Sequence, residues 1–178
     1  MTGLRRALDG LYRLSGALAA CCLVAILVLI VSQMVARWTG EVFPGAAEYA
    51  GYCMAAASFL AFAEALNRGA HVRVSVVLGM VGPRAARWID GWCLAVGTAV
   101  MWYVVWFGWR FVGFSWRFGD VSQGQDRTPL WMPQAVMLAG AAIFAVCLTD
   151  HLLTLVLTGR HRIDAGSDAA PGDQAFGE

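Results

Sequence analysis

Four apolar blocks, each about 20 residues long, limit what this chain of 178 residues can fold into. They cover residues 14–36, 47–66, 89–112 and 134–157. A helix of that length crosses the roughly 30 Å hydrocarbon core of a bilayer. Charged residues make up only 14% of the chain, against about 25% in a soluble domain. The sequence therefore predicts an all-α membrane protein with four transmembrane helices.

The first apolar block follows Arg5, Arg6 and Arg13, as the apolar part of a signal peptide would. It is longer than the roughly 7–15 apolar residues of a signal peptide, and three more blocks follow it. We therefore expect it to be retained as a helix. Residues 1–160 are predicted to form a single transmembrane domain. The Gly-, Ala- and Asp-rich residues 161–178 are predicted to form a disordered cytoplasmic tail.

The two longer connections between the blocks differ in character. Residues 67–88 mix Arg and His with an apolar run at 74–81 that is too short to span a bilayer, which predicts an interfacial amphipathic segment between the second and third helices. Residues 113–132 contain Gly, Pro, Asp and Arg and are flanked by Trp116 and Trp131. They are predicted to form a water-exposed loop with Trp at the membrane interface.

Arginine is distributed unequally between the two sides of the predicted membrane domain. All 13 Lys or Arg residues of the chain are arginines. Cytoplasmic segments of membrane proteins carry an excess of positive charge, which predicts cytoplasmic N- and C-termini. One side receives Arg5, Arg6, Arg13, Arg68, Arg73, Arg84, Arg87, Arg160 and Arg162, and the other receives Arg37, Arg117 and Arg127.

Small residues and tryptophans mark possible contact faces on the helices. Ala47, Gly51 and Ala55 are four apart, which either allows another helix to approach closely or reflects an Ala-rich block. The fourth block has a small face at Gly140, Ala141, Ala142 and Ala145. Trp102, Trp106 and Trp109 form a stripe on the third helix, which could contact a partner or a ligand but more often contacts lipid or neighbouring helices.

Ionisable residues at membrane depth are the first candidates for function. Glu64 precedes Arg68 by four residues, so the two can pair on one helix face. Glu64, Asp90 and Asp150 all lie toward the predicted cytoplasmic side, where a cation pathway and an interfacial or subunit contact are the alternatives. Their distance from the midplane favours the contact, because transport sites lie near the midplane.

Several chemistries are disfavoured by what the chain contains. The three histidines, at 71, 151 and 161, do not supply the facing pairs that a haem-binding bundle needs. The five cysteines lie in apolar blocks without a C-x-x-C pair, which disfavours thiol redox chemistry and zinc binding. There is no Walker A sequence and no basic tract for nucleic acid. We expect no catalytic residue, no cofactor and no metal.

The stretch 64–74, read as E-A-L-N-R-G-A-H-V-R-V, resembles the R-G-x-H-[IV]-x-V signature of the small membrane subunit of tripartite ATP-independent periplasmic (TRAP) transporters. The resemblance in layout covers residues 10–160. The position after Val74, often acidic in that family, is Ser75 here, which removes one charge partner for Arg68 or Arg73. Other agreeing features are Glu48, Pro83, Asp90 and the series Pro129, Trp131 and Pro133.

The resemblance implies a scaffold role. In that family the small subunit pairs with a large permease subunit that moves an organic acid and sodium, and a periplasmic binding protein delivers the substrate. No residue here is carried over as a substrate or sodium ligand. Membrane lipid is a further expected partner. Candidate residues for subunit contact or interfacial anchoring are Glu64, Arg68, His71, Arg73, Asp90, Trp102, Trp106 and Trp109.

The sequence thus predicts a non-enzymatic scaffold subunit of a secondary transporter. A stand-alone four-helix channel or small exporter is the main alternative, and it would need Glu64 or Asp150 to line a polar pore. A membrane redox protein is a further alternative, which a visible absorption spectrum would reveal.

Overall fold

The computed structural model describes residues 2–41, 44–68, 83–124 and 126–158. Four helices account for most of them: α1 (Thr2–Thr39), α2 (Ala46–Asn67), α4 (Pro83–Phe118) and α5 (Trp131–Thr158). Each is long and apolar enough to cross a membrane. The predicted fold class, an all-α protein with four membrane-spanning helices, is confirmed.

Two parts of the prediction fall on residues that are not described. The centre of the predicted interfacial segment, residues 69–82, and the predicted tail, residues 161–178, lie outside the described ranges. The ends of the interfacial segment belong to long helices, because α2 continues to Asn67 and α4 begins at Pro83. Proline suits the first position of a helix, where its missing N–H has no helical partner to lose.

Helices α1 and α4 extend beyond the apolar blocks from which they were predicted. Helix α1 begins at Thr2, and α4 continues through residues 113–118, which were predicted as loop. The helix ends where Gly119 adopts a positive φ of 63°, and the Asp120 N–H donates to the Ser115 carbonyl at 3.1 Å. The end of an apolar block marks where a helix leaves the bilayer. The helix itself ends where a residue in the left-handed conformation follows its last turn.

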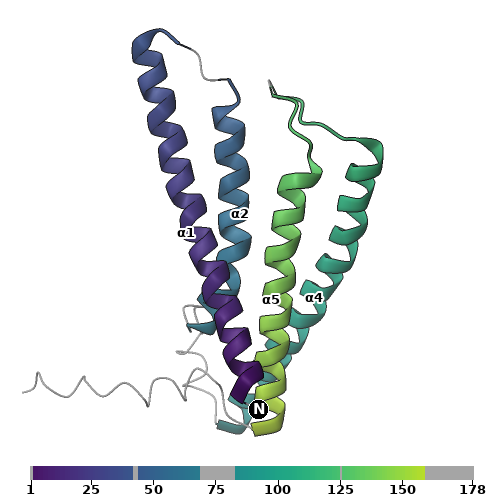
Figure 1. Ribbon diagram of the computed structural model, residues 1–178. Coiled ribbons are helices and arrows are strands. Elements are labelled where there is room, and N and C mark those ends of the chain that lie inside the picture. The colour runs from purple at the N-terminus through teal and green to yellow at the C-terminus, as the bar shows by residue number, and fades with distance from the viewer. Residues whose placement is uncertain (1, 42–43, 69–82, 125, 159–178) are drawn as a thin grey trace, which may run out of the picture.

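The helices are arranged in the spatial order α1, α2, α5, α4 (Figure 1). Helix α2 contacts both α1 and α5, and α5 contacts α4. The N-terminus and the last turns of α5 lie at one end of the bundle, which we call the N-terminal end. The end of α1, the start of α2 and the described residues of the loop 119–130 lie at the opposite end, which we call the loop end.

The core is concentrated near the N-terminal end, where α1, α2 and α5 converge. Tyr12, Ala63 and Cys147 are fully buried there, beside Leu66 and Leu148. Farther along, α2 and α5 meet at Gly140, where a β-carbon would lie 2.7 Å from the Phe59 carbonyl carbon. Ala141 and Ala145 are buried next to it, as the small face predicted on this helix requires.

The small-residue row predicted on α2 does not form a helix contact. Ala47 and Gly51 are exposed, and a β-carbon on Gly51 would meet nothing within 4 Å. The buried residues of α2 are instead Ala46, Ala56, Ala57, Leu60, Ala63 and Leu66. Alanine occurs on every face of this helix, so spacing alone did not identify the face that packs.

Candidate functional site

The predicted ion pair between Glu64 and Arg68 is present at the end of α2. The Arg68 Nε donates to Glu64 Oε1 at 2.6 Å, and the Arg68 backbone N–H donates to the Glu64 carbonyl at 3.0 Å. The Glu64 side chain is 12% exposed and that of Arg68 is 73% exposed. The carboxylate is therefore held inside the helix pair while the guanidinium reaches outward.

Glu64 lies in a groove between α1 and α2, which we call the α1–α2 groove. Its walls are mainly small residues, so the groove is wide, with a volume of about 510 Å³. Gly16 allows the contact, since a β-carbon there would lie 2.9 Å from Glu64 Cγ. Oxygen Oε2 of Glu64 is buried without a hydrogen-bond donor among the described residues. The groove is lined by Arg13, Gly16, Ala17, Ala61, Glu64, Ala65 and Arg68.

The other ionisable candidates are not assembled around this groove. Asp90 is half-buried on α4, and Asp150 is half-buried on α5. His151, which follows Asp150, is buried at 4% exposure. His71 and Arg73 lie outside the described residues.

Two polar residues of α1, Tyr12 and Ser15, are buried in a region where no functional residue was predicted. Tyr12 is fully buried, and the Ser15 hydroxyl donates to the Tyr12 carbonyl at 2.8 Å. Together with Ala19 they follow helical spacing along one face of α1. That spacing was the available signal, because a buried stripe on a membrane helix marks the side that packs against its neighbours.

The middle of each helix is free of charge. No Asp, Glu, Lys or Arg occurs in residues 14–36, 49–63, 91–109 or 131–149. A small space of about 180 Å³ between α2, α4 and α5 is lined by apolar residues such as Phe59, Val104 and Leu138, and by Gln134. The mid-membrane part of the bundle thus offers no charged ligand for an ion or an organic acid.

All three tryptophans of the predicted stripe on α4 are exposed, and one of them, Trp102 at 46%, also bonds to a neighbouring helix. Trp102 Nε1 donates to Thr149 Oγ1 at 3.1 Å, which links α4 to α5. Trp106 and Trp109 are 67% and 71% exposed. None of the most apolar stretch of α4 is buried within the chain. This face is therefore available to lipid or to another protein.

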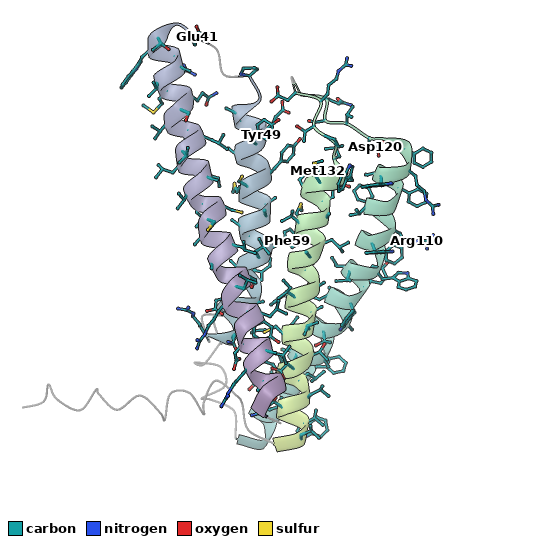
Figure 2. All side chains as sticks on the ribbon, in the orientation of Figure 1. Glu41, Tyr49, Phe59, Arg110, Asp120 and Met132 are labelled. Atoms are coloured by element: carbon teal, nitrogen blue, oxygen red, sulfur yellow. The ribbon has the colours of Figure 1, made fainter. Side chains whose placement is uncertain are left out.

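At the loop end, the loop 119–130 folds back on the start of α2. The Ser122 hydroxyl donates to Glu48 Oε2 at 3.2 Å, and Thr128 Oγ1 lies 3.4 Å from the Tyr49 hydroxyl. Val121 and Pro129 form an antiparallel bridge inside the loop. Tyr49 and Asp120 mark the two sides of this contact in Figure 2. The loop connects the α1–α2 pair to the α4–α5 pair.

Gly45 is required where the same loop approaches α2. It precedes the helix with φ 76°, and a β-carbon there would collide with the Asp126 carboxylate. Trp116 and Trp131, at the two ends of the loop, contact each other edge-to-face with ring centroids 4.5 Å apart. Aromatic side chains at this level are typical of a membrane interface.

The part of the chain that the structure describes contains no assembled site for metal or thiol chemistry. No group of three His, Cys, Asp or Glu residues there could hold a metal ion. All five cysteines are free thiols.

Comparison with known proteins identifies the family. The sequence profile described as "Tripartite ATP-independent periplasmic transporters, DctQ component" matches residues 26–158, which begin within α1 and include the apolar parts of α2, α4 and α5. A search of curated proteins finds no significant match. On the strength of the profile match and the four membrane-spanning helices, this chain belongs to the DctQ component family of tripartite ATP-independent periplasmic transporters.

Proposed function

We propose that this chain is a fixed scaffold for a large permease subunit and performs no catalysis itself. The large subunit would carry an organic acid together with sodium, and a periplasmic binding protein would deliver the acid. The observation that carries the proposal is the charge-free middle of all four helices, at residues 14–36, 49–63, 91–109 and 131–149. Secondary transporters bind substrate and ions near the midplane, and residues 14–36, 49–63, 91–109 and 131–149 offer no charged side chain for such a site.

A scaffold role fits the mechanics of a transporter whose substrate-carrying domain slides through the membrane. Such a domain needs a neighbour that does not move. Exposed tryptophans on α4, with the Trp116–Trp131 pair at the loop end, hold a helix at a defined depth because indole rings favour the interface. The loop bonded to Glu48 ties the two helix pairs together, which opposes their separation.

The α1–α2 groove is the surface that we assign to the large subunit. Small residues on both walls allow the backbone of an entering helix to come close, which drives helix association in membranes. Buried Glu64 Oε2 lacks a donor within the described residues, and a partner side chain could supply one. Arg13 and Arg68 add positive charge at the groove's edge, suited to an acidic group on the partner.

Co-purification with the large subunit tests this assignment. Ala61→Leu combined with Ala65→Leu fills the groove, and we expect it to lower recovery of the large subunit at least tenfold. Ala47→Leu, on the same helix but exposed at the loop end, should leave recovery unchanged. Thermal unfolding of each purified variant checks that the chain itself remains folded. If the folded double variant recovers as much large subunit as the original chain, the groove is not the contact surface.

A stand-alone channel receives no support from the position of Glu64. Its carboxylate is bonded to Arg68 in a groove between α1 and α2 instead of lining a space between all four helices. A channel would lose its flux in the Glu64→Gln variant, whereas a scaffold shows no flux of its own with either residue. Ion flux into liposomes that contain only this chain separates the two functions.

A further inference from the structure

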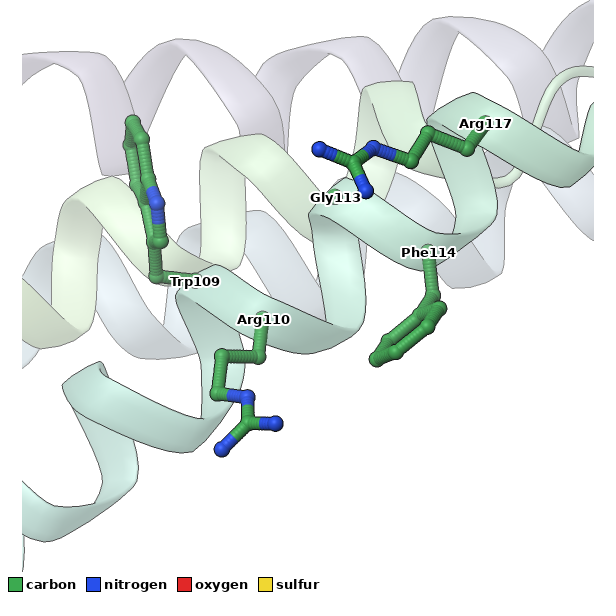
Figure 3. A pocket seen from close by; sticks show the side chains of 5 residues that line it. All are labelled: Trp109, Arg110, Gly113, Phe114 and Arg117. Atoms are coloured by element: carbon green, nitrogen blue, oxygen red, sulfur yellow. The ribbon is translucent and has the colours of Figure 1, made fainter.

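Two arginines near the loop end of α4 lie on an outward-facing surface. Arg110 and Arg117 are both exposed, and Figure 2 places Arg110 on the side of α4 away from α5. Together with Trp109, Gly113 and Phe114 they border an open depression of about 290 Å³ (Figure 3). We call this depression the α4 cradle. Neither arginine is used in the packing of the four helices.

The depth of Arg110 makes its charge costly without a counter-charge. It precedes the end of α4 by eight residues, which corresponds to about 12 Å along the helix axis. Phe107, Trp109 and Phe111 around it are exposed, so its surroundings are suited to the acyl region of a membrane. A charged side chain at such a depth extends to the interface or pairs with an opposite charge.

No counter-charge is supplied by the described part of the chain. Among residues 2–41, 44–68, 83–124 and 126–158, no acidic side chain forms an ion pair with Arg110 or Arg117. The two positive charges are separated by about 10 Å of helix rise. An anionic group placed between them would lower the electrostatic cost of both charges.

Gly113 leaves the space between the two arginines open. A β-carbon at this position would meet nothing within 4 Å. Figure 3 shows the Arg117 side chain running back along the helix above Gly113, while Arg110 leaves the helix on the side of Phe114. The two guanidinium groups thus flank a bare stretch of helix, with Trp109 and Phe114 as apolar borders.

We propose that the α4 cradle binds the phosphate of an anionic phospholipid from the leaflet at the loop end. The phosphate would lie over Gly113 between the two guanidiniums, which bind phosphate oxygens well because their N–H groups are planar and forked. The acyl chains would follow the exposed face of Trp106 and Trp109 toward the middle of the bilayer.

A lipid fits the cradle better than a carboxylate from a partner subunit. A phosphodiester and a carboxylate each carry one negative charge, so charge alone does not choose between them, and the size of the cradle does. Its open volume exceeds what a carboxylate fills, and a glycerophosphate with its headgroup occupies more of it. The exposed indole rings beside it are typical of residues at the level of lipid headgroups. The proposal requires only a membrane location and is independent of the transport role.

Lipid retention by the purified chain tests the proposal. Native mass spectrometry of the detergent-solubilised protein, titrated with phosphatidylglycerol or phosphatidylcholine, measures the affinity for each lipid. We expect the original chain to prefer phosphatidylglycerol. Arg110→Gln and Arg117→Gln should each weaken its binding roughly fivefold, and the double variant on the order of 30-fold, as expected for about 1 kcal/mol per arginine near an anionic surface.

Two further variants make the result specific. Gly113→Leu keeps both charges but fills the cradle, and we expect it to weaken phosphatidylglycerol binding at least fivefold. Arg37→Gln removes an exposed arginine at the same end of the molecule, in the last turn of α1, and should leave binding unchanged. Circular dichroism of each variant checks its helix content.

Three results would overturn the proposal. One is phosphatidylglycerol binding by the folded double variant at the original affinity. Another is an equal loss in the Arg37→Gln control. The third is an arginine variant that binds lipid as before but no longer co-purifies with the large subunit. That result would assign the arginines to a carboxylate of the partner. Each outcome leaves the groove and the transport role to be judged by their own experiments.

Discussion

Two glycines determine how closely the helices approach. At Gly140 the neighbouring atoms belong to the backbone of Phe59 in α2, and at Gly16 they belong to the flexible Glu64 side chain. Backbone atoms cannot move aside without shifting a helix, whereas a side chain can rotate. The contact between α2 and α5 is therefore the less tolerant of the two.

Replacing Gly140 should separate α2 from α5. A β-carbon at that position would lie 2.7 Å from the Phe59 carbonyl carbon. Overpacking typically costs about 1–3 kcal/mol, and alanine returns up to about 1 kcal/mol through its higher helix propensity. We expect Gly140→Ala to lower the thermal unfolding temperature in detergent. Gly51→Ala on α2, which meets only open space, serves as the control and should not lower it.

The Glu64–Arg68 pair was predictable because it depends only on spacing within one helix. Its contact with Gly16 was not, since that depends on how α1 crosses α2. The same distinction applies to Trp102, whose place on the stripe follows from the sequence but whose bond to Thr149 requires the fold. Local periodicity reveals which residues share a face, and the tertiary arrangement decides what the face meets.

At the level of helices and loops, apolarity predicted the four spans but not their ends. Helix α4 continues to Phe118, beyond its apolar block, and ends where Gly119 adopts a positive φ. Of the two alternatives for the row of Ala47, Gly51 and Ala55, the exposure of Ala47 and Gly51 within this chain favours the Ala-rich block. The docking of the loop on Glu48 joins residues 74 positions apart, which no local pattern indicates.

The bond from Ser122 to Glu48 should hold the loop 119–130 against α2. Ser122→Ala removes this bond and the one that the Ser122 hydroxyl accepts from the Gly124 N–H at 3.2 Å, and we expect it to weaken loop docking by about 1–3 kcal/mol. Hydrogen–deuterium exchange of residues 119–130 should then be several times faster, with exchange in α5 unchanged. Ser58→Ala is the control, because the Ser58 hydroxyl bonds only within α2, to the Met54 carbonyl. Equal protection in both variants would show that this bond does not hold the loop.

For the whole molecule, the distribution of arginine predicts its orientation in the membrane. Arg5, Arg6 and Arg13 precede the first span, and the loop end carries few basic residues. We expect alkaline phosphatase, which is active only outside the cytoplasm, to be inactive when fused at the C-terminus. The same enzyme inserted in the loop 119–130 should be active. The reverse pattern would place both termini outside.

The distribution of charge across the whole molecule favours the proposed scaffold role over a stand-alone channel. Glu48 and Arg110 lie toward the loop end, while Glu64, Asp90 and Asp150 lie toward the N-terminal end. Between these levels the helices are uncharged. The proposed scaffold needs a stable position in the bilayer and a surface for its partner, and neither requires a charged centre.

Reconstituted transport tests the scaffold role most directly. Uptake of a radiolabelled organic acid into proteoliposomes would be driven by a sodium gradient, with the proposed large subunit and binding protein supplied. We predict uptake with the complete system and none when this chain is the only membrane protein, with or without the binding protein. Sodium-driven uptake by liposomes containing this chain alone would contradict the scaffold role.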